Sequence, residues 1–410
     1  MKILMSLVGV VTIFALALLI SNNRRAINRR TVALAFLIQA SIGALVLFVP
    51  AGSAALDAVV RGVQYVINYG NDGVAFLFGT NLNKSLGFTI AFNVLPIIVF
   101  FASLMSVLYY LGIMQRFVGT FGGWLHKLLQ TSHAESVSAI SNIFVAHTDA
   151  PLVVRPYLAK MTNSELFAVM TGGCATIAGA VMMGYAQMGV DLKYLITASF
   201  MAAPGGLLMA KIMIPETEPQ DVSALEDMDE ADKPVNIFEA IGNGAMIGMQ
   251  VALSVGAMLV AFVGLIYLLN GVLSGVGAWF GFEGLTLQWL LGHLFSPVAY
   301  LLGVPWSEAV QAGSLIGQKL VINEFYAYAS FVEIKDSLSA HTQLVVTFAL
   351  CGFSNLASIA ILLGGLGAIV PSRRHDIARL GLRAVIGGTL VNLMNAALAG
   401  FFFSLQSTGL

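Results

Sequence analysis

Residues 307–335 read SEAVQAGSLIGQKLVINEFYAYASFVEIK, an apolar segment that is interrupted by charged and polar side chains. A helix needs about 20 apolar residues to cross the hydrocarbon core of a bilayer. The segment is therefore long enough to enter a membrane but too short to cross it twice. Residues 134–160 form a second interrupted segment of the same kind. Two such segments predict pairs of half-helices that enter the membrane and turn back.

The composition of the whole chain supports a membrane protein. Of its 410 residues, 58% are hydrophobic and 10% are charged, whereas an ordinary globular domain has roughly 25% charged residues. The mean hydropathy is +0.86. A net charge of −1 and the lack of a basic stripe argue against a nucleic-acid binder. The same composition excludes a disordered chain and a coiled coil.

Apolar runs along the chain predict an all-α polytopic membrane protein with about eight transmembrane helices and two re-entrant helical hairpins. The predicted spans are residues 3–21, 31–49, 88–112, 165–189, 194–214, 243–270, 342–370 and 384–405. Basic residues cluster in two loops, at Arg24, Arg25, Arg29 and Arg30 and at Arg373, Arg374, Arg379 and Arg383. Because basic loops stay in the cytoplasm, both termini are expected on the outer side.

The chain after residue 110 looks doubled. An amphipathic stretch at 115–130 precedes the first interrupted segment, and another at 285–303 precedes the second; two spans follow each. The halves begin on opposite sides of the membrane, so the repeat is inverted. Inverted repeats with interrupted segments at matching positions point to a secondary transporter with its site near the bilayer midplane.

The first interrupted segment carries a polar centre, Ala146-His147-Thr148-Asp149-Ala150-Pro151. An ionised carboxylate at membrane depth costs a few kcal/mol unless it faces water or a partner. Pro151 disfavours helix at the two residues before it, so the chain should turn there. The segment either forms a ligand-binding tip or is a loop that lies in water.

The second interrupted segment places Glu324 among apolar neighbours, five residues after Lys319. Either the two form an ion pair, or the carboxylate accepts hydrogen bonds from a polar substrate such as the vicinal hydroxyls of a ribose. Asn355 and Ser358 share one helical face, where they either bind a ligand or join helices. Thr176, in the matching span of the first half, has the same two interpretations.

Catalytic motifs are absent from the sequence. Cys174 and Cys351 lie apart in apolar runs, and no HExxH, Walker loop or GxSxG motif occurs. His147 and Asp149 are the only pair with acid–base potential. We therefore expect a protein that is not an enzyme, with a membrane-embedded hydrolase as a remote alternative.

A longer pattern carries a family resemblance. Gly317-x-Lys319-x3-Asn323-Glu324-Phe325-x-Ala327-Tyr328 matches the G-x-K-x3-N-E-F-x-A-Y signature of the concentrative nucleoside transporters, and Val94-Leu95-Pro96 and Cys351-Gly352-Phe353-x-Asn355-x-x-Ser358-Ile359 match further family patterns. The chain most resembles the short bacterial members over essentially its whole length. The resemblance implies a homotrimer in the cytoplasmic (inner) membrane, in which a scaffold holds a mobile transport domain.

The same resemblance implies a division of the chain. The scaffold would comprise residues 1–112 and 243–270, and an acidic cytoplasmic linker would comprise residues 215–242. The transport domain would comprise residues 113–214 and 271–410, with one re-entrant hairpin in each part.

The resemblance also implies the site and the activity, which is sodium-coupled nucleoside uptake by alternating access. The nucleobase would face His147, Thr148, Asp149 and Val181, and the ribose would be held by Glu324, Asn355 and Ser358 with Phe353 nearby. The sodium ligands would be the side chains of Asn142, Thr148 and Thr176 and the carbonyls of Val145 and Ile177.

The tip of the first hairpin departs from the family pattern. Where the family usually reads Gly-Gln-Thr-Glu-Ala-Pro, this chain reads Ala146-His147-Thr148-Asp149-Ala150-Pro151. Asp is one methylene shorter than Glu, and His replaces an amide by a ring that changes charge near neutral pH. We therefore expect an altered base preference. Proton coupling through His147 or Asp149 is the alternative to sodium coupling.

Overall fold

The computed structural model describes residues 2–79, 87–147, 150–219, 234–282 and 284–408, and within these ranges every regular element is helical. The N-terminal part contains α1 (Lys2–Ile20), α2 (Arg29–Leu47), α3 (Pro50–Phe78), α5 (Leu95–Tyr110), α6 (Ile113–Leu129), α7 (His133–Ser141), α8 (Arg155–Leu158), α9 (Asn163–Ala175), α10 (Gly179–Gln187) and α11 (Leu192–Met213). The C-terminal part contains α12 (Ile237–Trp279), α13 (Leu287–Leu301), α14 (Trp306–Val321), α15 (Glu324–Ile334), α16 (Ala340–Leu350), α17 (Ala357–Gly364), α18 (Leu366–Ile369) and α19 (Arg374–Thr408). A π-helical turn, Ile90–Val94, leads into α5.

Seven helical stretches of the described chain are long and apolar enough to cross a membrane, or eight if the bent pair α13 and α14 counts as one span. They are Lys2–Ile20, Arg29–Leu47, Ile90–Tyr110, Asn163–Gln187, Leu192–Met213, Ile237–Trp279 and Pro371–Ser407. The bend between α13 and α14 is 115°. The polytopic all-helical class predicted from the sequence is therefore confirmed.

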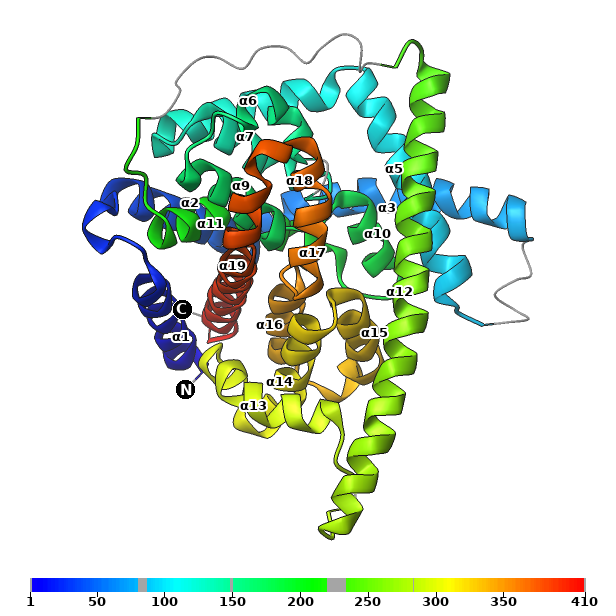
Figure 1. Cartoon of the computed structure of the whole chain (residues 1–410). Coiled ribbons are helices and arrows are strands. Elements are labelled where there is room, and N and C mark those ends of the chain that lie inside the picture. The colour runs from blue at the N-terminus through cyan, green and yellow to red at the C-terminus, as the bar shows by residue number, and fades with distance from the viewer. Residues whose placement is uncertain (1, 80–86, 148–149, 220–233, 283, 409–410) are drawn as a thin grey trace.

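The interior of the molecule lies among α9, α11, α16 and α19, whereas α12 runs beside α5 away from this core, with part of α3 extending beyond it (Figure 1). In the most apolar window of each helix, 94% of α11 is buried but only 17% of α12. At 1.5 Å per residue the 43 residues of α12 extend over roughly 65 Å, about twice the hydrocarbon thickness of a bilayer. The predicted span 243–270 was too short, because residues 237–242 and 271–279 also belong to this helix.

Two glycines let α12 approach α5 closely. A Cβ atom at Gly248 would lie 2.7 Å from the Cα of Val99, and one at Gly244 would lie 2.6 Å from the Cβ of Ser106. Small residues four positions apart are a common means of close helix packing in membranes. The α5–α12 pair therefore forms a tightly packed unit beside the helical core.

Two predicted spans are interrupted. The helix expected over residues 165–189 ends at Ala175 and resumes at Gly179, and the one expected over 342–370 ends at Leu350 and resumes at Ala357. A side chain of α19 contacts both breaks, because the Nδ2 of Asn392 donates to the carbonyls of Ala175 and Cys351, each at 2.7 Å. The hydropathy of either segment contains no sign of this contact, so the sequence predicted the apolar stretch Asn163–Gln187 as a span but not the break within it.

Helix α3 was missed by the sequence analysis, which assigned no element between residues 49 and 88. Pro50 occupies its first turn, and among its residues only Ile67 and Gly70 are buried. The helix lies crosswise to α12 (Figure 1). Its polar residues, which include Asp57, Arg61 and Asp72, interrupt the apolar pattern, so a search for membrane spans passes over it.

The two halves share a matching backbone hydrogen bond. The N–H of Gly179, where α10 begins, donates to the Phe144 carbonyl at the first hairpin tip (3.0 Å). The N–H of Leu356, just before α17, donates to the Leu320 carbonyl at the second tip (3.1 Å). Each interrupted span therefore holds the hairpin of its own half in the same way.

Candidate substrate and ion site

A cavity of about 560 Å³ lies between α12 and the two hairpin tips. Six of the eight residues predicted to bind substrate line it, namely His147, Val181, Glu324, Phe353, Asn355 and Ser358. The other two, Thr148 and Asp149, lie outside the described residues. The structure thus brings residues of both halves to one cavity, and their roles there remain predictions.

Glu324 begins α15 and is buried, with 5% of its surface exposed. Its carboxylate accepts hydrogen bonds from Asn355 Nδ2 at 2.8 Å and from the Tyr185 hydroxyl at 3.3 Å. The helix N-terminus also favours negative charge at this position. A carboxylate has about four acceptor sites, so two neutral donors leave capacity for hydroxyl groups of a ligand.

The ion pair between Lys319 and Glu324, which the sequence left open, does not form. Lys319 Nζ instead donates to the Ala349 carbonyl at 3.0 Å and to Asn392 Oδ1 at 2.5 Å. No ion pair between described residues joins Lys319 to an acidic group. The carboxylate of Glu324 is therefore not neutralised by direct contact with a cationic side chain.

Asn355 is fixed by the turn that leads into α17. Its Oδ1 accepts from the backbone N–H of Ser358 at 3.0 Å and from the Ser358 hydroxyl at 3.1 Å. This arrangement aims Nδ2 of Asn355 at Glu324. The result is one row of polar groups that runs from Ser358 through Asn355 and Glu324 to Tyr185, a residue of α10 that no sequence motif had pointed to.

His147 forms the opposite, first-half side of the cavity. Its ring lies 5.0 Å from the Phe353 ring, between centroids. The residue is 6% exposed, and neither ring nitrogen has a partner within the described chain. A buried polar group without a hydrogen bond costs about 1–3 kcal/mol, so a ligand that reaches this ring would be favoured.

Asn142 marks the region predicted to hold a cation. It is 1% exposed, and its Oδ1 and Nδ2 both lack a partner among the described residues. A Cβ built on Gly172 would lie 3.5 Å from Nδ2, which places the amide against the end of α9. Thr176, at the interruption that follows, donates its hydroxyl to the Gly172 carbonyl at 3.0 Å.

The predicted sodium ligands divide between two adjacent segments. Asn142 and Val145 lie on the first hairpin tip, and Thr176 and Ile177 lie in the break between α9 and α10; Thr148 falls outside the described residues. The Gly179–Phe144 hydrogen bond joins these segments. Nothing in the described chain groups three or more His, Cys, Asp or Glu side chains around a metal position. Neutral amide, hydroxyl and carbonyl oxygens remain, and these suit a hard cation.

The wall of the cavity opposite the hairpins comes from α12. Gln250 and Ser254, four residues apart on one face of this apolar helix, both line the cavity. Neither residue was predicted from the sequence, although two polar residues at helical spacing within an apolar span were the available signal. A second cavity of about 450 Å³ between α3, α5 and α12 is lined by apolar residues and Ser103, which offers a polar substrate few partners.

Comparisons with known proteins agree with this arrangement. Three family descriptions match successive parts of the chain: "Na+ dependent nucleoside transporter N-terminus" over residues 8–81, "Nucleoside recognition" over 91–191, and "Na+ dependent nucleoside transporter C-terminus" over 194–400. The nucleoside permease NupC of Helicobacter pylori is 51% identical over 416 residues, which cover 98% of this chain and 99% of the permease.

Two solved structures extend the comparison. The structure of CNTnw in an inward-facing substrate-bound state superposes with a TM-score of 0.95 at 55% identity, covering 99% of each chain. A variant of CNTnw in an outward-facing state gives a TM-score of 0.94 at 54% identity, covering 99% of this chain and 98% of that one. The similarity therefore includes the whole fold and both hairpins.

Proposed function

This chain belongs to the Na⁺-dependent, concentrative nucleoside transporter family, and from that premise we propose that it takes up nucleosides together with sodium by alternating access. It is a transporter and not an enzyme. One observation carries the proposal: the polar residues of both pseudo-symmetric halves meet in a single cavity of about 560 Å³ against α12. A cavity of this size is in the range that holds a small ligand.

The ribose would be held by the second half. The carboxylate of Glu324 has free acceptor capacity for the 2′- and 3′-hydroxyls, and Asn355 and Ser358 lie beside it. Hydrogen bonds to a charged group contribute about 1.5–3 kcal/mol each. Nucleosides that lack one of these hydroxyls should therefore bind roughly tenfold to a hundredfold more weakly.

The nucleobase would lie between the first hairpin tip and the break before α17. Phe353 offers an aromatic face, Val181 an apolar contact, and the unpartnered nitrogens of His147 offer hydrogen bonds. Because His147 replaces the amide usual in the family, base preference is the property in which this protein should differ. A competition panel of purine, pyrimidine and modified nucleosides against labelled uridine tests this expectation.

Asn142, Val145, Thr148, Thr176 and Ile177 would hold the sodium ion. The unpartnered amide of Asn142, buried against α9, supports this assignment. A sodium ion supplies about 2.3 kcal/mol per 100 mV of membrane potential, and a tenfold sodium gradient adds about 1.4 kcal/mol. Asn142 and His147 share one short tip, so occupancy of either region should favour occupancy of the other.

Alternating access would use α12 as the fixed wall and the hairpin halves as the moving part. The resemblance to CNTnw structures described as inward-facing and as outward-facing supports two such states. We also propose a homotrimer in the cytoplasmic membrane with both termini outside. The long exposed apolar surface of α12 is a suitable face for its assembly.

Uptake into proteoliposomes tests the coupling. Labelled uridine and adenosine should accumulate when sodium is higher outside, and equal uptake with and without this gradient would rule out sodium coupling. Uptake that is driven by outside acid without sodium, and that weakens in His147→Gln, would instead support proton coupling. Chromatography of the internal label should return the unchanged nucleoside, which a hydrolase would not do.

A further inference from the structure

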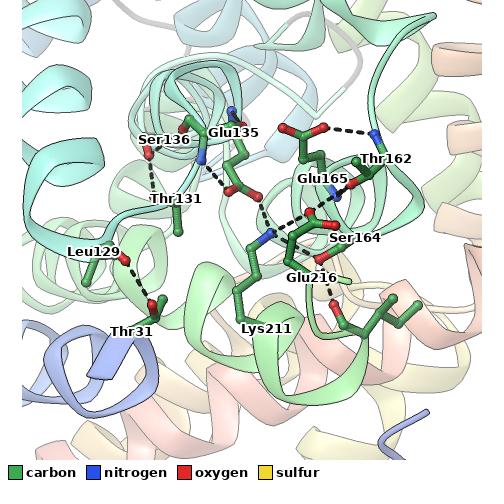
Figure 2. A network of polar contacts seen from close by, with 12 residues as sticks. Thr31, Leu129, Thr131, Glu135, Ser136, Thr162, Ser164, Glu165, Lys211 and Glu216 are labelled. Carbon is green, nitrogen blue, oxygen red and sulfur yellow. Dashed lines mark hydrogen bonds and ion pairs between the residues drawn. The ribbon is translucent and has the colours of Figure 1, made fainter. Parts of the chain in front are cut away.

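Lys319 is a buried basic side chain whose hydrogen-bond partners are neutral. It is 1% exposed, and its Nζ donates to the Ala349 carbonyl and to Asn392 Oδ1. The other deeply buried lysine, Lys211, pairs with the Glu135 carboxylate at 2.7 Å (Figure 2). An isolated charge in a low-dielectric interior is costly, so the surroundings of Lys319 must supply compensation in another form.

The compensation comes from the ends of interrupted helices. Ala349 lies in the last turn of α16, and Asn392 connects the ammonium to the carbonyls of Ala175 and Cys351, where α9 and α16 stop. Helix C-termini carry unsatisfied carbonyls and a partial negative charge. The ammonium group therefore lies at the C-terminal end of α16 and is linked through Asn392 to that of α9.

The repeat relates this place to the proposed sodium region. The two matching backbone bonds pair Phe144 with Leu320, so Lys319 corresponds to Ile143, the neighbour of Asn142. They also pair Gly179 with Leu356. The Asn392 amide bonds the carbonyls of Ala175 and Cys351 alike, and three residues before these lie Gly172 and Phe348, the neighbour of Ala349.

The contacts agree with this correspondence to within one residue. In the first half the Asn142 amide lies against Gly172, and in the second half the Lys319 ammonium lies against Ala349. The side-chain amides of Asn392 and Asn142 differ in their hydrogen bonds. Asn392 uses both of its polar atoms, because Oδ1 accepts from Lys319 and Ser354 while Nδ2 donates to two carbonyls. Asn142 has no partner within the described residues.

We propose that Lys319 is a resident cation, whose ammonium fills in the second half the position that a dissolved cation would fill in the first. This inference rests on the proposed sodium region around Asn142. One half of the repeat is then closed around a basic side chain of its own. The other half is left open to an ion from solution, and only that half can couple transport to a gradient.

The test compares three purified variants in proteoliposomes and in thermal unfolding with increasing sodium. Lys319→Met removes the charge but fills the space, so uptake should fall by roughly tenfold or more, while sodium should still raise the melting temperature. Lys319→Ser leaves room for a second ion, so uptake should become sigmoidal in sodium, with a Hill coefficient that rises from about one towards two. The melting temperature of Lys319→Ser should also respond about twice as steeply to log sodium concentration.

Lys211→Met is the matched control, because Lys211 is a buried lysine of the same core that pairs with a carboxylate. It should lower the melting temperature without changing the slope against log sodium concentration. The inference would be overturned if uptake and melting temperature of Lys319→Ser depended on sodium concentration as they do in the wild type. Full uptake by Lys319→Met would also overturn it. If Lys319→Ser does not fold, two other variants provide the test. Uptake by Lys319→Arg should depend on sodium as in the wild type, and Lys319→Gln should lose uptake. Equal behaviour of these two variants would overturn the inference.

The measurements on the wild type distinguish a failure of this inference from a failure of the proposed sodium coupling. No response of the wild type to sodium in either measurement would refute sodium coupling. The role of Lys319 would then be judged by whether Lys319→Ser gains a response to sodium, lithium or potassium that the wild type lacks. Absence of any gained response would refute the resident cation as well.

Discussion

The carboxylate of Glu324 can recognise hydroxyl groups because only neutral side chains hold it. Tyr185 and Asn355 orient the group without cancelling its charge, and Lys319 bonds elsewhere. Among the residues of this cavity, Glu324 was identifiable from the sequence, since it is an acidic group in an apolar run within a family signature. Tyr185 was not, because its role depends on a helix that is remote in sequence being packed against α15.

Glu324→Gln should abolish the discrimination between uridine and 2′-deoxyuridine. The amide keeps the shape of the side chain but loses the charge, which should lower uridine affinity roughly tenfold to a hundredfold. Binding to the detergent-purified protein, measured by calorimetry, checks the value. Glu333→Gln, at an exposed position on the same helix, is the control and should bind as the wild type does. Unchanged discrimination in Glu324→Gln would contradict the assignment of the ribose.

The hairpin tips and the helix breaks are the elements that build the site, and each tip depends on the break beside it. Gly173 provides the space for the first tip, because a Cβ there would lie 2.7 Å from the Cβ of His147. The neighbouring position is more tolerant, since a Cβ at Gly172 would meet nothing closer than Asn142 Nδ2 at 3.5 Å. These two adjacent glycines therefore give a matched pair of substitutions.

Gly173→Ala should displace His147 and weaken nucleoside binding, whereas Gly172→Ala should leave it close to the wild type. Overpacking of this kind costs about 1–3 kcal/mol, which corresponds to a loss of affinity of roughly fivefold to a hundredfold if the tip must shift to bind. Competition for labelled uridine measures both variants. An equal effect of the two substitutions would mean that the tip is not positioned by this contact.

Asn392→Leu should destabilise both breaks at once. The substitution keeps the approximate size but leaves the carbonyls of Ala175 and Cys351 without their amide donor, at about 1–3 kcal/mol for each buried group, and leaves Lys319 with Ala349 as its remaining acceptor. Asn395→Leu, one turn away on α19, removes bonds to Gln39 and Ala198 outside the site. Thermal unfolding should show the larger loss in Asn392→Leu, and uptake should be lost only there.

The breaks also mark the limit of what the sequence could predict about elements. Apolar length located the spans before α12 to within two residues, whereas α12 and α19 extend up to nine and ten residues beyond the predicted bounds. Polar residues in apolar runs located both hairpins. The interruptions at 176–178 and 351–356 both contact Asn392, a single amide that lies 41 residues from Cys351 and 217 from Ala175. Helix α3 was missed because its amphipathic pattern does not resemble that of a membrane span.

At the scale of the whole molecule, a buried ionic network ties three parts of the first half together. Lys211 of α11 bonds Glu135 of α7 at 2.7 Å, the Ser164 hydroxyl of α9 at 3.0 Å, and lies 3.7 Å from Glu216, which follows α11 (Figure 2). Glu135 also caps α7 through the Ser132 N–H. The base of the first hairpin is thereby fixed to the core helix on which it packs.

Lys211→Met should reduce the free energy of unfolding by about 3–5 kcal/mol, because it leaves a buried carboxylate unpaired. Adding Glu135→Gln removes that charge while keeping the helix cap, so the double variant should regain most of the loss. The melting temperatures of the two single variants and the double variant provide the measurement. Glu165→Gln, in the equivalent cap of α9, is the control and should be nearly neutral. Additive losses would show that the two groups do not stabilise each other.

The length of α12 has a consequence for the lipid environment. A rod of roughly 65 Å cannot stand upright within a hydrocarbon layer of about 30 Å without protruding, so it must incline or extend into the headgroups. Its inclination is therefore set in part by hydrophobic mismatch. Because Gln250 and Ser254 of this same rod line the nucleoside cavity, acyl-chain length should tune how widely the cavity opens.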